Sequence, residues 1–191
     1  CIAQDTRSGK TDTWYVGTGE RYSSASGDWS ALWLGNGILK STDNGVTWDT
    51  LSATTSNTPQ KQDPFDMIWN IAIDPSATDD EIYVATNSVI YKSTDGGESF
   101  TGVLSSTAAA YADVICTSTG VLYATLGGGG TNNGIWRSED GDNWTNVSSG
   151  CGFGSSFNRI VLCADPQNGN NVFFFANTPG VGHQTFNFLG N

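Results

Sequence analysis

One short pattern recurs three times in this chain and constrains its fold more than any other feature. Ser41–Trp48 reads S-T-D-N-G-V-T-W, Ser93–Phe100 reads S-T-D-G-G-E-S-F, and Ser138–Trp144 is a copy that is one residue shorter. Each copy follows a short apolar run that ends in Lys or Arg. Three copies in equivalent surroundings indicate a chain built from a repeated unit.

The residue types of this pattern predict a hairpin turn. Ser and Asp side chains accept backbone N–H bonds within a loop, and Gly supplies the positive φ that closes it. An aromatic residue then begins the return strand and is expected to cover the hairpin. Turn residues that recur in every unit cannot all belong to one active site, so we predict a structural role for them. They are Ser41, Asp43, Gly45, Trp48, Ser93, Asp95, Gly97, Phe100, Ser138, Asp140 and Trp144.

The pattern S-x-D-x-G-x-T-W after a β-strand resembles the Asp-box of BNR-repeat β-propellers. That group includes sialidases, xyloglucanase-like glycoside hydrolases, sortilin-type receptors and many secreted bacterial proteins. Two copies match over all eight positions when Ser is allowed for Thr and Phe for Trp, and the third matches with a deletion. The resemblance implies a propeller fold and says little about function.

The rest of the sequence predicts an all-β chain. It has 24 glycines, many short β-branched and aromatic runs, and no long segment of helical period in its 191 residues. We expect four-stranded antiparallel blades over about residues 1–51, 68–104 and 113–147, followed by an incomplete blade over 159–191. In that last unit we expect two strands and then an irregular tail, Thr178–Asn191, in which the single histidine, His183, has no assigned role.

About three and a half blades do not close a ring of the usual four to eight. We therefore expect the chain to be part of a larger propeller, with its remaining blades on a longer polypeptide. Self-association is the alternative way to cover the open sheet faces.

Charge and composition narrow the classes of partner. The formal net charge of −11 disfavours nucleic acid, and the chain has no polybasic patch for anionic lipid and no apolar stretch long enough to span a membrane. Few Lys and Arg beside abundant Ser, Thr, Asn and Gly is common in exported proteins, so we expect a secreted or cell-surface protein. The four cysteines lack metal-ligand spacing, so neither a metal nor a cofactor is expected, and their disulfide state stays open.

The candidate functional residues lie in the long loops, which an up-and-down blade places at the end opposite the repeated turns. Glu20, Trp29, Trp33 and Trp69 combine exposed aromatic rings with a carboxylate, which suits a sugar that stacks on Trp and bonds through its hydroxyls. A glycosidase needs two facing carboxylates, for which Glu20, Asp28 and Asp66 are the weaker, catalytic candidates.

Three readings of function follow. The first is a non-catalytic propeller module that binds a glycan or a protein surface through its long loops. The second is part of a xyloglucanase-like or sialidase-like glycoside hydrolase. The resemblance to sialidases implies three arginines that bind a carboxylate, and this chain has Arg7, Arg21, Arg137 and Arg159. Arg137 occupies the position of the cation before each repeated turn, and Arg159 lacks the Phe-Arg-Ile-Pro order of that family, which weakens the sialidase alternative. The third is a structural or adhesion spacer in a large surface protein.

Overall fold

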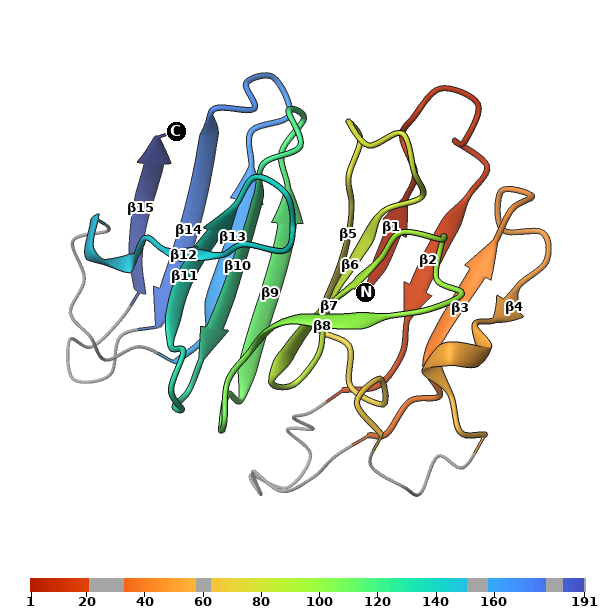
Figure 1. Cartoon of the computed structure of the whole chain (residues 1–191), viewed down its shortest axis with the longest axis horizontal. Helices are drawn as coiled ribbons and strands as arrows, with labels where there is room; N and C mark the ends of the chain where they lie inside the picture. The colour runs from red at the N-terminus through yellow and green to blue at the C-terminus, as the bar shows by residue number, and fades with distance from the viewer. Residues whose placement is uncertain (21–32, 58–62, 151–157, 178–183, 191) are drawn as a thin grey trace.

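The protein is described by a computed structural model that covers residues 1–20, 33–57, 63–150, 158–177 and 184–190. Four antiparallel sheets follow one another along the chain and lie side by side, from the first at the right to the last at the left of Figure 1. The described residues contain two short 3-10 helices, η1 (Ser52–Thr54) and η2 (Ser148–Gly150), and no α-helix. None of them forms a helix long and apolar enough to cross a membrane.

Each of the first three sheets has four strands in chain order. The first contains β1 (Ile2–Gln4), β2 (Trp14–Gly17), β3 (Ile38–Ser41) and β4 (Asp49–Thr50). The second contains β5 (Asn70–Ile73), β6 (Ile82–Ala85), β7 (Val89–Ser93) and β8 (Thr101–Ser105). The third contains β9 (Tyr111–Cys116), β10 (Leu122–Gly127), β11 (Gly134–Ser138) and β12 (Thr145–Asn146). The fourth contains β13 (Ile160–Ala164), β14 (Asn171–Asn177) and β15 (Gln184–Gly190).

The core lies between the sheets, because successive residues of a strand point to opposite faces. In the second sheet, Ile71 and Val84 pack toward the first sheet, whereas Ala72 and Tyr83 pack toward the third. The central strands β6 and β10 are therefore buried along their whole length. This arrangement explains why they read as continuous apolar runs rather than as alternating ones.

The predicted all-β chain of four-stranded antiparallel blades is confirmed, and the fourth sheet is more complete than expected. The segment Thr178–Asn191, expected to be an irregular tail, contains β15, which pairs with β14 over seven residues from Asn177↔Gln184 to Asn171↔Gly190. The signal was the alternation of Phe186, Asn187 and Phe188, which has the period of two that a strand requires.

The connections sort to two opposite ends of the sheets. The three repeated turns lie at one end, called here the turn end, and the connections β2–β3, β4–β5, β10–β11 and β12–β13 lie at the other, the long-loop end. The first strands of neighbouring sheets contact one another, β1 with β5, β5 with β9, and β9 with β13. These inner strands carry side chains from all four sheets to one place.

Candidate ligand-binding site

The repeated turns at the turn end use their polar side chains internally. Ser41 Oγ donates to Asp43 Oδ1 over 2.8 Å and accepts from the backbone N–H of Gly45. The same carboxylate accepts from the backbone N–H of Thr47 over 2.8 Å and from its hydroxyl over 2.6 Å. These bonds hold the pKa of Asp43 at about 2, below its ordinary value of 3.8, with the Thr47 hydroxyl as the largest cause.

The other two turns repeat this geometry. Asp95 accepts from Ser93 Oγ and from both the N–H and the hydroxyl of Ser99, and its pKa is likewise lowered to about 2. In the shorter third turn, the amide side chain of Asn143 takes the place of the hydroxyl and donates to Asp140 Oδ2 over 2.7 Å. The three carboxylates therefore stabilise the turns in which they lie, through hydrogen bonds within each turn.

The aromatic residues that follow the turns divide into two kinds. Trp48 and Trp144 each donate an indole N–H to the carbonyl of the turn glycine, Gly45 or Gly141, over 3.1 Å. Phe100 instead packs its ring 5.0 Å from that of Phe65. In each case the ring contacts the protein rather than forming a free binding platform.

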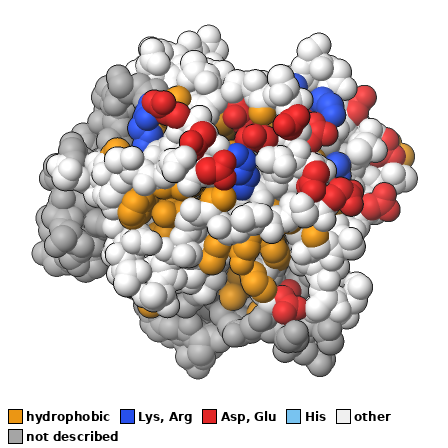
Figure 2. Space-filling view, in the orientation of Figure 1, with side chains coloured by type: hydrophobic (Ala, Val, Ile, Leu, Met, Phe, Trp, Pro, Cys, Tyr) orange, Lys and Arg blue, Asp and Glu red, His pale blue; other side chains and the backbone are white. Residues whose placement is uncertain are grey.

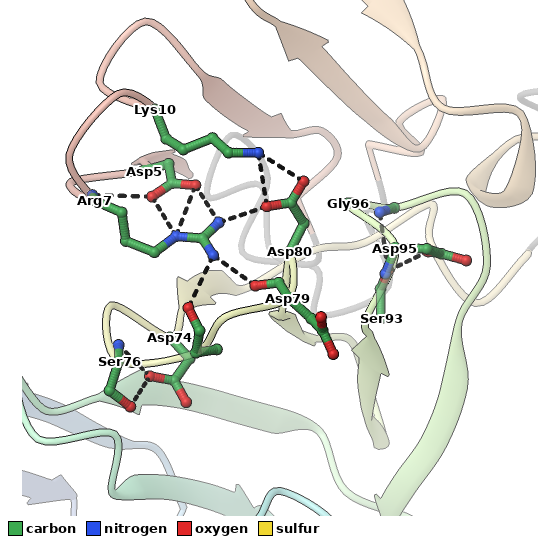
Figure 3. A network of polar contacts seen from close by, with 12 residues as sticks. Asp5, Arg7, Lys10, Asp74, Ser76, Asp79, Asp80, Ser93, Asp95 and Gly96 are labelled. Atoms are coloured by element: carbon green, nitrogen blue, oxygen red, sulfur yellow. Dashed lines mark hydrogen bonds and ion pairs between the residues drawn. The ribbon is translucent and has the colours of Figure 1, made fainter.

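Charged groups at the turn end are also used within the protein. Figure 3 shows the guanidinium of Arg7 between the carboxylates of Asp5 and Asp80, which it contacts over 2.5 and 2.8 Å. Its Nη1 also donates to the carbonyls of Ala77 and Asp79, and Lys10 reaches Asp80 over 3.0 Å. The network fastens the first connection of sheet one to the first connection of sheet two.

The long-loop end brings two of the predicted residues together. Glu20 and Trp33 exchange both backbone hydrogen bonds, each of 2.8 Å, in an isolated antiparallel bridge beyond β2 and β3. Residues paired in this way have their side chains on the same face of the ribbon. Trp33 is 64% exposed and Glu20 is also exposed, so a carboxylate and an aromatic ring lie next to each other at the protein surface. This pair, Glu20 and Trp33, is called the rim.

A hollow of about 310 Å³ lies beside this bridge. Its walls come from the start of the first sheet, the entrance to β5 and the entrance to β13, and its residues are Cys1, Gly19, Glu20, Met67, Ile68, Trp69 and Arg159. A second hollow of about 210 Å³ continues along the inner strands and shares Trp69 and Arg159 with the first. The two hollows together are lined by residues from all four sheets.

Trp69 stands between these hollows with its ring contacted on two sides. The guanidinium carbon of Arg159 lies 5.1 Å from the ring centroid, within the range of a cation–π contact, and the ring of Tyr111 lies 5.6 Å away. Trp69 is half-buried, whereas Arg159 is exposed. The predicted site residue Trp69 therefore shares a hollow with Glu20, and each offers a different chemistry to a ligand.

Asp113 lies in the wall of the second hollow and joins three sheets. Its Oδ1 accepts from Asn70 Nδ2 over 2.8 Å and from its neighbour's N–H, that of Val114, while Oδ2 accepts from the N–H of Leu162 over 2.8 Å. Burial raises the pKa of Asp113, and the three N–H donors and the positive charge of Arg159 act in the opposite direction. Only 6% exposed, it fixes the inner strands in register around the site.

Of the two acids named beside Glu20 as weaker catalytic candidates, the structure describes Asp66. Asp66 is 3% exposed, and its carboxylate accepts from the N–H of Asp63 in a tight turn, which gives it a structural role. Asp28 and Trp29 lie outside the described residues.

Sequence reasoning missed Arg159 and Asp113 as parts of this site. Arg159 directly precedes the apolar run of β13 at the long-loop end, a position that could have nominated it. Asp113 is a single acid within the apolar run of β9, and such a residue signals a buried partner network. Among the described cysteines, Cys1, Cys116 and Cys163 are free thiols, and no metal-binding cluster occurs in the described ranges.

Comparison with solved structures identifies the fold. A GH74 enzyme of Niastella koreensis superposes with a TM-score of 0.60 at 20% identity, and a GH74 xyloglucanase from Xanthomonas campestris with 0.59 at 15%. YCF48 from Cyanidioschyzon merolae superposes with 0.51 at 16%. The matches cover 98%, 97% and 97% of this chain. The fold is that of a β-propeller.

The chain spans 29% of the length of each of the two GH74 proteins and 54% of YCF48. At these identities the likeness establishes the fold and leaves the activity to be argued from the site. No protein-family model matches the sequence, and a search of curated proteins finds no relative.

Proposed function

We propose that this chain is part of an exported or cell-surface β-propeller of the BNR/Asp-box kind that binds a glycan at its long-loop end. The observation that carries the proposal is the bridge between Glu20 and Trp33, which sets an exposed ring beside a carboxylate at the rim of the hollow that contains Trp69. The Ser-x-Asp turns support the BNR/Asp-box assignment.

The chemistry of the rim suits a sugar. The apolar face of a pyranose ring stacks on an exposed indole, while its hydroxyls bond to carboxylates and amides. Trp33 supplies the ring, and Glu20 supplies an acceptor directly across the ribbon. The volume of this hollow, about 310 Å³, is at the lower end of the range for small-molecule sites. It suits one or two sugar units of a longer chain.

A second candidate is that the chain carries part of a glycoside hydrolase. It is favoured by the propeller likeness to two GH74 proteins, one of which is described as a xyloglucanase. Glu20 is the acid that this candidate would use, and its partner would come from the undescribed loops or from further blades. A third candidate, a spacer in a large surface protein, requires none of the rim chemistry.

Retention on immobilised polysaccharides tests the proposal. Trp33→Ala should abolish retention without lowering the melting temperature, because the side chain is 64% exposed. Trp48→Ala, which removes a partly exposed indole at the turn end, should leave retention intact and serves as the matched control. If both variants are retained as strongly as the parent protein, Trp33 does not bind the glycan and the proposed site is wrong.

An assay for reducing ends separates the two glycan readings. If the chain is part of a hydrolase, polysaccharide incubated with the complete protein releases reducing ends and Glu20→Gln stops the release. If it only binds, no release occurs while retention persists. A folded protein that neither retains nor cleaves any polysaccharide would support the spacer.

A further inference from the structure

Arg159 differs from the other described cations in how its charge is used. Arg7 and Lys10 bind Asp80, Lys40 donates to the carbonyl of Gly96, Lys92 binds Asp142, and Arg137 binds Glu139. Within the described ranges, the Arg159 guanidinium makes neither a hydrogen bond nor an ion pair, and its contact is the face of Trp69. A guanidinium carries five N–H donors, so this one is available to a ligand.

The position of Arg159 places those donors inside the candidate site. Its side chain lines both the hollow of about 310 Å³ and the hollow of about 210 Å³. The ring of Trp69 lies 5.1 Å from the guanidinium carbon and limits the directions that the side chain can take. A planar cation held at the wall of a hollow matches the geometry of a carboxylate, which it can bind through two parallel hydrogen bonds.

The acidic side chains of the protein leave Arg159 able to bind the carboxylate of a ligand. Figure 2 shows most of the acidic side chains of this face over the upper part of the molecule, and few beside the apolar surface below. Charges farther apart than about 8 Å are largely screened at physiological salt. Asp113 shares the wall of the second hollow with Arg159, and the positive charge of Arg159 acts to lower its pKa, but both oxygens of Asp113 are occupied by three N–H bonds from other residues.

We infer that this site takes an acidic sugar, with the carboxylate of a uronic acid bound by Arg159 and a sugar ring stacked on the exposed indole of Trp33. The inference rests on the proposed glycan-binding function and narrows its ligand class. Glu20 lines the same hollow and repels a second anion, so the site favours a chain that presents one carboxylate there over a densely charged polyanion.

The test compares matched ligands on the complete protein. Tetramers of galacturonate, mannuronate and glucuronate are each titrated by calorimetry beside their carboxyl-reduced forms, which keep the linkages and lose only the charge. At least one acidic tetramer should bind about tenfold or more tightly than its reduced form. Arg159→Gln should remove that difference, and Arg159→Lys should restore part of it.

Arg137→Gln is the matched control, because it removes an Arg of the turn end and the same unit of net charge. It should leave the preference for the acidic tetramer unchanged. Equal binding of acidic and reduced forms, or a preference that survives Arg159→Gln, would overturn the inference.

The remaining outcomes separate the inference from the function on which it rests. Binding of neutral polysaccharides alone, lost in Trp33→Ala, would reject the acidic ligand and retain the glycan-binding function. Absence of binding to every acidic and neutral glycan would reject both. Melting temperatures of all variants show whether a loss of binding reflects a loss of fold.

Discussion

The ammonium of Lys40 donates a hydrogen bond of 2.9 Å to the carbonyl oxygen of Gly96, which lies in the repeated turn of the next sheet. Lys92 repeats the contact one sheet later, with a bond of 2.8 Å to the carbonyl of Asp140. Each lysine also lies over the ring of its cross-strand tyrosine, Tyr15 or Tyr83, at 5.4 and 5.7 Å. The cation that precedes each turn therefore fastens its own sheet to the turn of the following one.

Replacing Lys92 by Met should lower the free energy of unfolding by about 1–2 kcal/mol, because a charged hydrogen bond is lost at a side chain that is only 10% exposed. Met keeps most of the apolar stem. Lys10→Met is the control, since the ion pair of Lys10 with Asp80 is largely exposed and contributes at most about 1 kcal/mol. Urea unfolding midpoints measure both, and equal effects would contradict the role given to Lys92.

The turn carboxylates should make the fold sensitive to acid. The pKa values of Asp43 and Asp95 are lowered to about 2 in the folded protein from an ordinary value of 3.8. A lowered folded pKa stabilises the fold above the unfolded pKa, and that stabilisation is lost as the pH falls. We therefore expect the melting temperature to decline between about pH 4 and pH 2, the window these two values define.

The double variant Asp43→Asn, Asp95→Asn checks this dependence. It should start with a lower melting temperature at pH 6 and show a shallower decline on acidification than the parent protein. Asp12→Asn is the control, because Asp12 takes part in turn structure through its backbone carbonyl, which accepts from the N–H of Asn44. A decline as steep as that of the parent would mean that other carboxylates control acid unfolding.

Two glycines with nearly the same backbone conformation should respond differently to substitution. Gly9 and Gly19 have φ of +80° and +85°, but a Cβ at Gly9 meets nothing within 4 Å, whereas one at Gly19 would lie 1.8 Å from the carbonyl oxygen of Asp66. Gly9→Ala should cost about 1 kcal/mol through backbone strain alone.

Gly19→Ala should cost about 3 kcal/mol or more, because the backbone at Asp66 must also move. Gly19 and Glu20 line the main hollow, so this variant should weaken glycan retention as well. Chemical denaturation measures the stability of the two variants, and retention on polysaccharide measures their binding. If Gly9→Ala weakens retention as much as Gly19→Ala does, the loss of binding does not come from a change at the site.

Much of this fold follows from the sequence because the information is local. The turn pattern, the short apolar runs and their spacing predict strands and hairpins without reference to distant residues, as with Ser93–Phe100 between β7 and β8. β15 escaped prediction because its alternating Phe and Asn residues follow a segment rich in Gly and have no repeated turn after them.

The site is less predictable because it depends on contacts between sheets. Glu20 and Trp33 could be nominated as an aromatic and acidic loop, but their direct pairing is set by the register of β2 and β3. Arg159 is 90 positions from Trp69 in the sequence, and only the contact of the inner strands β5, β9 and β13 brings the two together. No local pattern carries that information.

Asp113 should be the most sensitive carboxylate of the described chain, since its two oxygens join the second, third and fourth sheets. Asp113→Ala leaves three N–H donors without an acceptor at a site that is 6% exposed, and should cost about 3 kcal/mol or more. Asp113→Asn should cost less, because its carbonyl oxygen can still accept from Asn70 and Val114 while its amide faces the N–H of Leu162.

Hydrogen exchange locates the loss. The amide of Leu162 should exchange faster in both variants than in the parent protein, because its acceptor is removed in one and replaced by a donor in the other. The amide of Val84, in the buried strand β6, should change only as far as global stability changes. If Leu162 stays as protected as before, the fourth sheet is held by the apolar packing of Ile160 and Phe174 alone, and the carboxylate only sets the register of the inner strands.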